Sequence, residues 1–181
     1  EHPESFPIII GLDETGSMSS IPYYLITEAF PDIMKRILEE GVKDPQVCFL
    51  GIGDFHYDDA PIQAGQFETS DLLLDKWLRK VYLEGGGGGN AGEDYHLAWY
   101  FAARHTVTDS YTKRGKKGIL ITIGDESCNP DLDQTTILRQ FGDTTKSTTS
   151  KEILEEARKS WNVIHINIAH GYSSERIKSS R

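Results

Sequence analysis

The sequence has little that would suit a nucleic-acid-binding or membrane-spanning protein. Its 28 acidic residues outnumber 19 lysines and arginines, giving a net charge of -9, so the basic surface that nucleic acids attract is missing. No apolar run approaches the roughly 20 residues of a membrane-spanning helix, and no signal peptide is evident. Only two cysteines occur. Cys48 and Cys128 resemble small core residues of a reducing compartment, and nothing supports a disulfide between them.

Common catalytic motifs are also lacking. There is no Gly-x-Ser-x-Gly motif and no nucleophile with a paired base. The glycine run Gly85–Gly89 is not followed by Lys-Ser or Lys-Thr, so it is not a phosphate-binding P-loop. It is either a flexible linker or a loop whose backbone approaches a ligand closely. The histidines show no metal-binding spacing.

What the sequence does contain is an alternation of strands and helices. Apolar runs predict strands at 6–12, 47–52, 119–123 and 163–168, and helical patterns cover 21–40, 70–83, 93–106, 134–141 and 151–160. We therefore expect an α/β fold with a doubly wound, mostly parallel central sheet and helices on both faces. In the segment 21–40 the expected inward residues lie four apart: Ile21, Leu25, Ala29, Ile33 and Ile37. Pro31 predicts a kink or break there.

The first strand carries the most informative motif. Asp13 ends the strand, and Thr15 and Ser17 follow at alternate positions. One carboxylate and two hydroxyls on a turn suit a hard cation such as Mg²⁺, which prefers oxygen ligands. The other interpretation is a strand-to-helix turn in which one of these side chains caps the helix. These residues alone do not favour either interpretation.

Two further strands end in Gly-Asp, at Asp54 and Asp125. The carboxyl ends of parallel strands share one edge, so Asp13, Asp54 and Asp125 can converge there. A loop-capping role is favoured for Asp54. For Asp125 a functional role is favoured, and the neighbouring Glu126 is a further candidate for binding a metal or partner.

These features resemble the von Willebrand factor type A domain, in which an Asp-x-Ser-x-Ser motif follows the first strand. Here the first serine of that motif is Thr15, and the family's third-loop aspartate corresponds to Asp125. The resemblance implies a metal-ion-dependent adhesion site that holds Mg²⁺, or else Mn²⁺ or Ca²⁺, at Asp13, Thr15, Ser17 and Asp125. The family's second loop usually supplies a threonine, which is absent from 85–92. Asn90, Glu93 or Asp94 could replace it, or water could.

The resemblance also implies binding rather than catalysis. In the family a protein partner completes the metal coordination, often with an Asp or Glu, so we expect such a partner and neither nucleic acid nor membrane. The glycine-rich loop with Glu-Asp-Tyr-His-Leu-Ala is most similar to intracellular bacterial and phage members, which implies a cytoplasmic protein that could work with an ATPase-associated complex.

The expected domain covers 1–170, and the tail 171–181 has no core pattern and is expected to be disordered. The family has one more strand and a C-terminal helix after 163–168. Too few residues follow His170 for both, so either the chain was trimmed or this member of the family is short.

Two other functional classes remain open at this stage. Phosphatases of the haloacid dehalogenase type also place an aspartate after the first strand and a Gly-Asp motif after a later one. They need a second aspartate two positions on, where this chain has Thr15. The other alternative is a scaffold domain that binds through different loops without metal.

Overall fold

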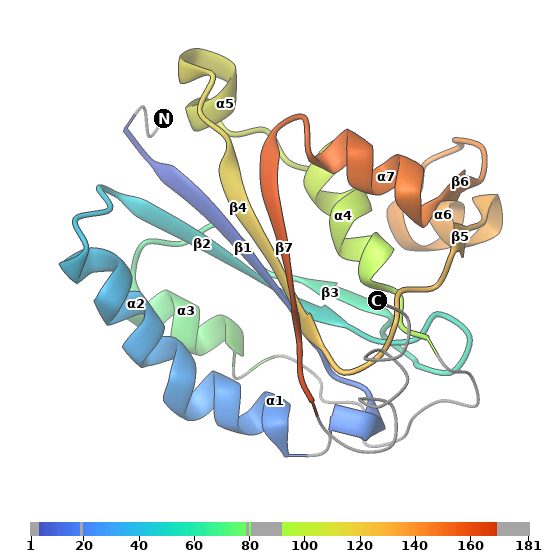
Figure 1. Cartoon of the computed structure of the whole chain (residues 1–181), viewed down its shortest axis with the longest axis horizontal. Coiled ribbons are helices and arrows are strands. Elements are labelled where there is room, and N and C mark those ends of the chain that lie inside the picture. The colour runs from blue at the N-terminus through green and yellow to red at the C-terminus, as the bar shows by residue number, and fades with distance from the viewer. Residues whose placement is uncertain (1–3, 19, 79, 81–91, 170–181) are drawn as a thin grey trace.

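A five-stranded sheet forms the centre of the molecule (Figure 1). The computed structural model describes residues 4–18, 20–78, 80 and 92–169. The strand order is β3-β2-β1-β4-β7, with β1 at Phe6–Asp13, β2 at Pro45–Ile52, β3 at Ile62–Ala64, β4 at Gly118–Gly124 and β7 at Trp161–Asn167. All pairings are parallel except that of the edge strand β3 with β2.

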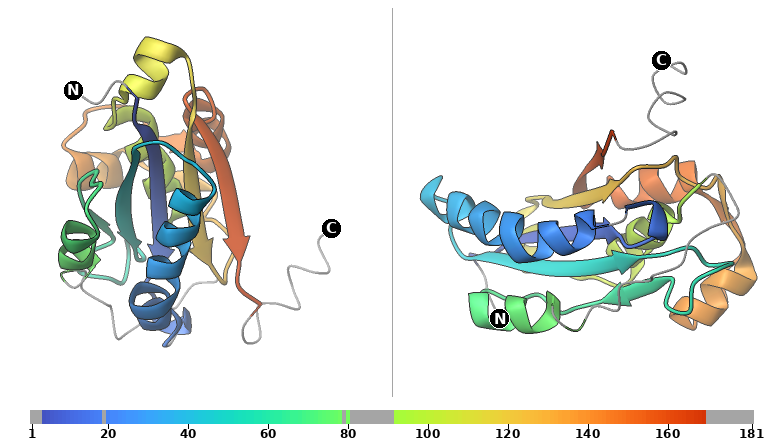
Figure 2. Two further views of the ribbon diagram at one scale, coloured as in Figure 1. Left: turned by 90° about the vertical axis from the view of Figure 1, so that its left-hand side faces the viewer. Right: turned by 90° about the horizontal axis from the view of Figure 1, so that it is seen from below.

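Helices cover both faces of this sheet, which explains the continuous apolar runs of β1 and β2. One face packs against α1 (Ile21–Tyr24), a π-helical turn (Leu25–Ala29), α2 (Phe30–Glu39) and α3 (Asp71–Leu78). The other packs against α4 (Tyr95–Arg104), α6 (Gln134–Phe141) and α7 (Ser150–Ala157). Figure 2 shows the two layers from the side. The predicted doubly wound α/β fold is confirmed.

The predicted break at Pro31 is accommodated without ending the helix. The turn before it widens into a π-helix, and the Phe30 backbone amide bonds to the Leu25 carbonyl, five residues back. Proline lacks an amide hydrogen and its ring collides with the carbonyl four residues earlier, so a widened turn relieves the conflict. The helix therefore continues to Glu39.

This extra residue changes which side of α2 faces the core. Phe30 and Met34 are buried, whereas Ile33 is 38% exposed. The expected inward position of Ile33 is therefore wrong. The prediction assumed a spacing of four residues through the whole segment. The π-helical turn adds one residue, so Met34 takes the core-facing position expected for Ile33.

Smaller differences concern helix boundaries. Glu93 and Asp94 were expected inside the helix 93–106, but α4 begins at Tyr95 with Asp94 as its N-cap. A short helix, α5 (Asp109–Arg114), precedes β4 and is closed by Gly115 in the left-handed conformation. In α3, Leu74 is buried and its neighbour Leu73 is 38% exposed.

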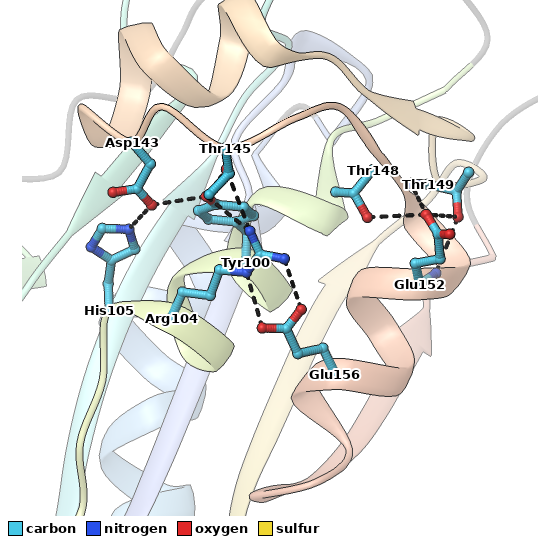
Figure 3. Close-up of polar contacts among 9 residues, drawn as sticks. All are labelled: Tyr100, Arg104, His105, Asp143, Thr145, Thr148, Thr149, Glu152 and Glu156. Carbon is cyan, nitrogen blue, oxygen red and sulfur yellow. Dashed lines mark hydrogen bonds and ion pairs between the residues drawn. The ribbon is translucent and has the colours of Figure 1, made fainter.

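A polar network joins α4 to α7 and to the chain between α6 and α7 (Figure 3). Arg104 donates to both carboxylate oxygens of Glu156, at 2.9 and 2.8 Å. The Tyr100 hydroxyl donates to Asp143 at 2.8 Å, and the same carboxylate oxygen lies 2.9 Å from His105 Nε2. The next segment forms β6 (Thr148–Thr149), which pairs with β5 (Asp131–Leu132). This network holds α4 and α7 together. It therefore also helps to position the residues just before α4.

The last described strand, β7, is less buried than its apolar sequence predicts. Ile164 and Ile166 are 47% and 44% exposed, and His165, expected in a buried strand, is also exposed. Both cysteines are free thiols. The expected tail at 171–181 lies outside the described residues. No helix within the described ranges is long and apolar enough to cross a membrane.

Candidate metal centre

The candidate site lies where two neighbouring strands end. From β1 the chain leads through α1 and α2 to β2 on one side, whereas β4 lies on the other side of β1. The carboxyl ends of β1 and β4 therefore flank a topological switch point, where open α/β sheets bind ligands. Asp13 is the last residue of β1, and Asp125 directly follows β4. The structure thus brings these two predicted residues together.

Thr15 and Ser17 connect the two aspartates through hydrogen bonds. Asp13 Oδ1 accepts bonds from the Thr15 backbone amide at 2.9 Å and from the Thr15 hydroxyl at 2.6 Å. The hydroxyl oxygens of Thr15 and Ser17 lie 3.1 Å apart. Ser17 Oγ in turn donates to Asp125 Oδ1 at 2.9 Å. Asp13, Thr15 and Asp125 are buried, whereas Ser17 is exposed, so this row of oxygens runs from the sheet edge to the surface.

The helix-capping alternative does not account for these residues. The N-cap of α1 is Ser20, and no side chain makes a capping hydrogen bond there. The motif runs into a short 3₁₀ turn, Gly16–Met18, which contains Ser17 and precedes the helix. The side chains of Asp13, Thr15 and Ser17 are therefore directed to one another and to Asp125.

Tyr95 is a residue of the site that the sequence did not reveal. Its hydroxyl donates to Asp13 Oδ2 at 2.9 Å and itself accepts a bond from the Glu126 backbone amide. The close approach requires Gly124, because a Cβ there would collide with the Tyr95 hydroxyl and lie 2.7 Å from Asp13 Oδ2. An aromatic residue in an apolar helix gives no sequence signal for this role.

Glu93 is held beside this row by the loop that carries Asp125. Its backbone amide donates to the Ser127 carbonyl at 2.8 Å, and its own carbonyl accepts from the Asn129 amide at 2.9 Å. The Glu93 side chain is 6% exposed, and it lies close enough to Thr15 and Asp13 for both to influence its pKa. Of the three candidates for the second-loop position, Glu93 is therefore the one in contact with the row.

The two other second-loop candidates differ from Glu93. Asp94 has both oxygens occupied by protein donors: the Phe55 amide and the Asn129 side chain, each at 2.7 Å. It fastens the loop after β2 to the loop after β4, which is a structural role. Asn90 lies outside the described residues, as does the glycine run 85–89.

Asp54 does cap its own loop, as the sequence favoured. Its Oδ1 accepts a hydrogen bond from the His56 amide at 2.7 Å, and its backbone amide donates to Asp58 at 2.6 Å. The side chain is only 1% exposed, however, and none of the described residues donates a hydrogen bond to its buried Oδ2. A surface cap would have both oxygens in contact with donors or water.

Burial dominates the electrostatics of the site. It raises the pKa of Glu93 from 4.5 to about 9, and the charges of Asp13, Asp54 and Asp94 add to the increase. Burial likewise raises the pKa of Asp13 from 3.8 to about 6, although hydrogen bonds from Thr15 and Tyr95 oppose this. Within the described part of the chain, no lysine or arginine forms an ion pair with Asp13, Asp54, Glu93 or Asp125. Such a site favours an added positive charge.

The spacing of the oxygens suits a small divalent cation. Adjacent ligands of an octahedral Mg²⁺ site, at about 2.0–2.1 Å from the metal, lie about 3 Å from one another. The successive oxygens from Asp13 to Asp125 are 2.6, 3.1 and 2.9 Å apart. Among the described residues no group of three or more His, Cys, Asp or Glu side chains has the geometry of a metal site. Binding would therefore depend on the hydroxyls as well as the two carboxylates.

A cysteine and a histidine, Cys128 and His96, lie near the site, but the thiol is not activated. Cys128 Sγ is 3.5 Å from His96 Nδ1, and His96 Nε2 is 3.6 Å from Asp94. Burial raises the pKa of the Cys128 thiol to about 12 and lowers the pKa of His96. The thiol therefore stays protonated at neutral pH, as the interpretation of Cys128 as a packing residue predicts.

Comparisons with known proteins support the fold only. No family model and no curated protein matches the sequence. The crystal structure of the pilus adhesin SpaC from Lactobacillus rhamnosus GG, in its open conformation, is similar with a TM-score of 0.59 and 12% identity over 97% of this chain. A second crystal form of that adhesin gives the same TM-score at 13% identity. This chain spans about a quarter of the adhesin, 26% of its length.

An aerotolerance-related membrane protein from Bacteroides fragilis NCTC 9343, with multiple mutations to serine, matches with a TM-score of 0.45 and 14% identity over 96% of both chains. At these identities the similarities concern the fold and not the function.

Proposed function

We propose that this chain is a von Willebrand factor A-type domain that binds a protein partner through a divalent cation, most simply Mg²⁺. The observation that carries the proposal is the unbroken row of oxygens from Asp13 through Thr15 and Ser17 to Asp125, at a topological switch point. The similarity of fold to a pilus adhesin fits an interaction domain. In the proposal these four residues hold the cation, and the cation supplies a positive charge and open coordination positions.

The partner is proposed to present an Asp or Glu side chain. Ser17 is exposed, so the row reaches a surface from which another protein can approach. A carboxylate is the natural ligand for a cation in such a partly buried position, where its interaction is strengthened by exclusion of water. Because the chain carries a net charge of -9, attraction of an acidic partner must come from the cation at short range.

Calorimetric titration with MgCl₂ tests the cation. The unmodified protein should bind one Mg²⁺, and saturating Mg²⁺ should stabilise it against heat, by about 2.7 kcal/mol at 100 times the dissociation constant. Asp13→Ala should abolish both effects. Asp59→Ala, which removes an exposed acidic residue, should change neither. Absence of Mg²⁺ binding to the unmodified protein would contradict the proposal.

Selection from a random displayed peptide library tests the partner chemistry. With Mg²⁺ present, we expect enrichment of peptides that share an Asp or Glu, and their release by EDTA. The same selection on Asp13→Ala should enrich none of them. Peptides recovered equally from both proteins and in EDTA would show that association uses another surface.

A further inference from the structure

Two carboxylate oxygens near the row have no hydrogen-bond donor among the residues that the structure describes. They are Asp54 Oδ2 and Glu93 Oε2, and both are buried. Asp54 is 1% exposed and Glu93 is 6% exposed, so bulk water reaches neither side chain freely. Leaving a buried acceptor unpaired is unfavourable, and more so when it is charged. Both oxygens therefore indicate that donors belong there.

The residues that the structure describes do not offer those donors. The other oxygen of Asp54 is engaged by the His56 amide. The side-chain charges that act on Glu93 come from Asp13, Asp54 and Asp94, all of one sign. A small donor that also brings positive charge would suit both oxygens.

We propose that Asp54 and Glu93 accept hydrogen bonds from water molecules bound to the cation at Asp13, Thr15, Ser17 and Asp125. The inference rests on the proposed function, since it requires that cation. Mg²⁺ usually keeps several of its waters in protein sites, and each bound water is a strong donor. A role through water also agrees with the ligand geometry, because Glu93 and Asp54 do not form a three-carboxylate metal site with Asp13.

Both carboxylates are held in place before any cation binds. The Glu93 backbone is fixed by bonds to Ser127 and Asn129, on the loop after Asp125. Asp54 is fixed by the His56 amide and by its own amide bond to Asp58. These acceptors replace the threonine that the second loop lacks. They orient the cation's inner waters, and a partner's carboxylate would displace a different water, on the side of the exposed Ser17, without disturbing the direct ligands.

The test measures Mn²⁺ affinity and counts the water bound to Mn²⁺. Glu93→Gln and Asp54→Asn keep the side-chain shape and remove the charge. Each should weaken Mn²⁺ binding about 10–100-fold, the usual effect of losing an outer-shell partner. Electron–nuclear double resonance in ¹⁷O water should find the same number of Mn²⁺-bound waters in both variants as in the unmodified protein.

Glu14→Gln is the matched control. Glu14 is a buried acid at the same sheet edge, but its carboxylate accepts from the Gln63 side chain at 2.8 Å. The substitution should leave Mn²⁺ affinity within about twofold of the unmodified protein. If Glu93→Gln gains one Mn²⁺-bound water, Glu93 is a direct ligand and the inference is wrong. If neither variant changes the Mn²⁺ affinity, neither residue acts on the bound cation and the inference is again wrong. Both outcomes leave the proposed metal site standing. If the unmodified protein binds no Mn²⁺ or Mg²⁺, the proposed metal site itself is wrong.

Discussion

Acidic residues buried without a positive partner distinguish the candidate site from the rest of the surface. Other carboxylates have a positive partner, such as Glu156 with Arg104. At the site, Asp13 accepts hydrogen bonds from the Thr15 amide and from the Thr15 and Tyr95 hydroxyls, and the charges acting on Glu93 are those of other acids. This arrangement is costly for a protein that binds nothing there, and it is relieved when a cation binds.

Stability in the absence of metal should therefore depend on pH. The pKa values of Glu93 and Asp13 are raised in the folded protein, so folding favours their protonated forms. Their contribution to stability is fully present below the pKa of the unfolded chain and is lost as the pH rises through the folded values. In EDTA the free energy of unfolding should fall between about pH 5 and pH 9.

Glu93→Gln identifies the source of this fall. In EDTA the variant should show a clearly smaller loss of stability above pH 6, because the group with the larger shift is gone. Urea unfolding at several pH values is the measurement. An identical pH profile in the variant would contradict the assignment of the shift to Glu93.

Tyr95 offers a second test at this scale. Tyr95→Phe removes the donor to Asp13 Oδ2 and leaves a buried oxygen unpaired. We expect the unfolding free energy to drop by about 1–3 kcal/mol and Mg²⁺ binding to weaken. Tyr111→Phe, at an exposed tyrosine, should have little effect. Equal stabilities for the two variants would show that the Tyr95 hydroxyl does not support Asp13.

The sequence predicted the part of the site that is local or set by strand ends. Asp13, Thr15 and Ser17 follow one another on a single turn, and Asp125 follows an apolar strand, so both signals are readable without coordinates. The roles of Tyr95 and Glu93 depend on how α4 and the loop after β4 pack against β1. That packing is a tertiary property, so residue spacing could not predict it.

The secondary-structure elements were predictable where one periodicity extends through the whole segment. The strands β1, β2 and β4 and the helix α6 are examples, since each has a continuous apolar run or a regular helical spacing. In the helix at 21–40, Ile21, Leu25 and Ile37 pack against the core as predicted, but Ile33 does not, because the π-helical turn before Pro31 adds a residue to one turn. β7 was predicted to be buried, but its exposure depends on what covers an edge strand.

Substitutions in α2 distinguish the two helix faces. Met34→Ala should lower the unfolding free energy by about 2–5 kcal/mol, because Met34 is 7% exposed and lies in the core. Ile33→Ala should cost less than about 1 kcal/mol, because that side chain is largely in solvent. Urea denaturation of both variants is sufficient. A larger loss for Ile33→Ala would mean that the helix keeps a regular spacing through Pro31.

For the whole molecule, the topology explains why the functional residues gather at one place. The chain runs outward from β1 in both directions, so the ends of β1 and β4 leave an opening between helices of opposite faces. The acidic loops after β2 and β4 meet at the same edge, joined by Asp94. Function is therefore expected from this edge.

The same arrangement argues against phosphate ester hydrolysis. A haloacid dehalogenase-type enzyme needs an acid/base carboxylate where this chain has Thr15, which instead hydrogen-bonds Asp13. With Mg²⁺ and p-nitrophenyl phosphate, the purified protein should show no more turnover than Asp13→Asn. Turnover that co-purifies with the unmodified protein and disappears in Asp13→Asn would replace the binding-domain proposal with an enzyme.

The most direct test of the metal centre is a crystal structure of the protein with saturating Mg²⁺. Our proposal predicts an octahedral cation with Thr15 Oγ1 and Ser17 Oγ at about 2.0–2.1 Å. Asp13 and Asp125 should contact it directly or through water, and waters should lie between the cation and the carboxylates of Asp54 and Glu93. Crystals that show no cation among Asp13, Thr15, Ser17 and Asp125 at saturating Mg²⁺, with the Thr15 and Ser17 bonds retained, would contradict it.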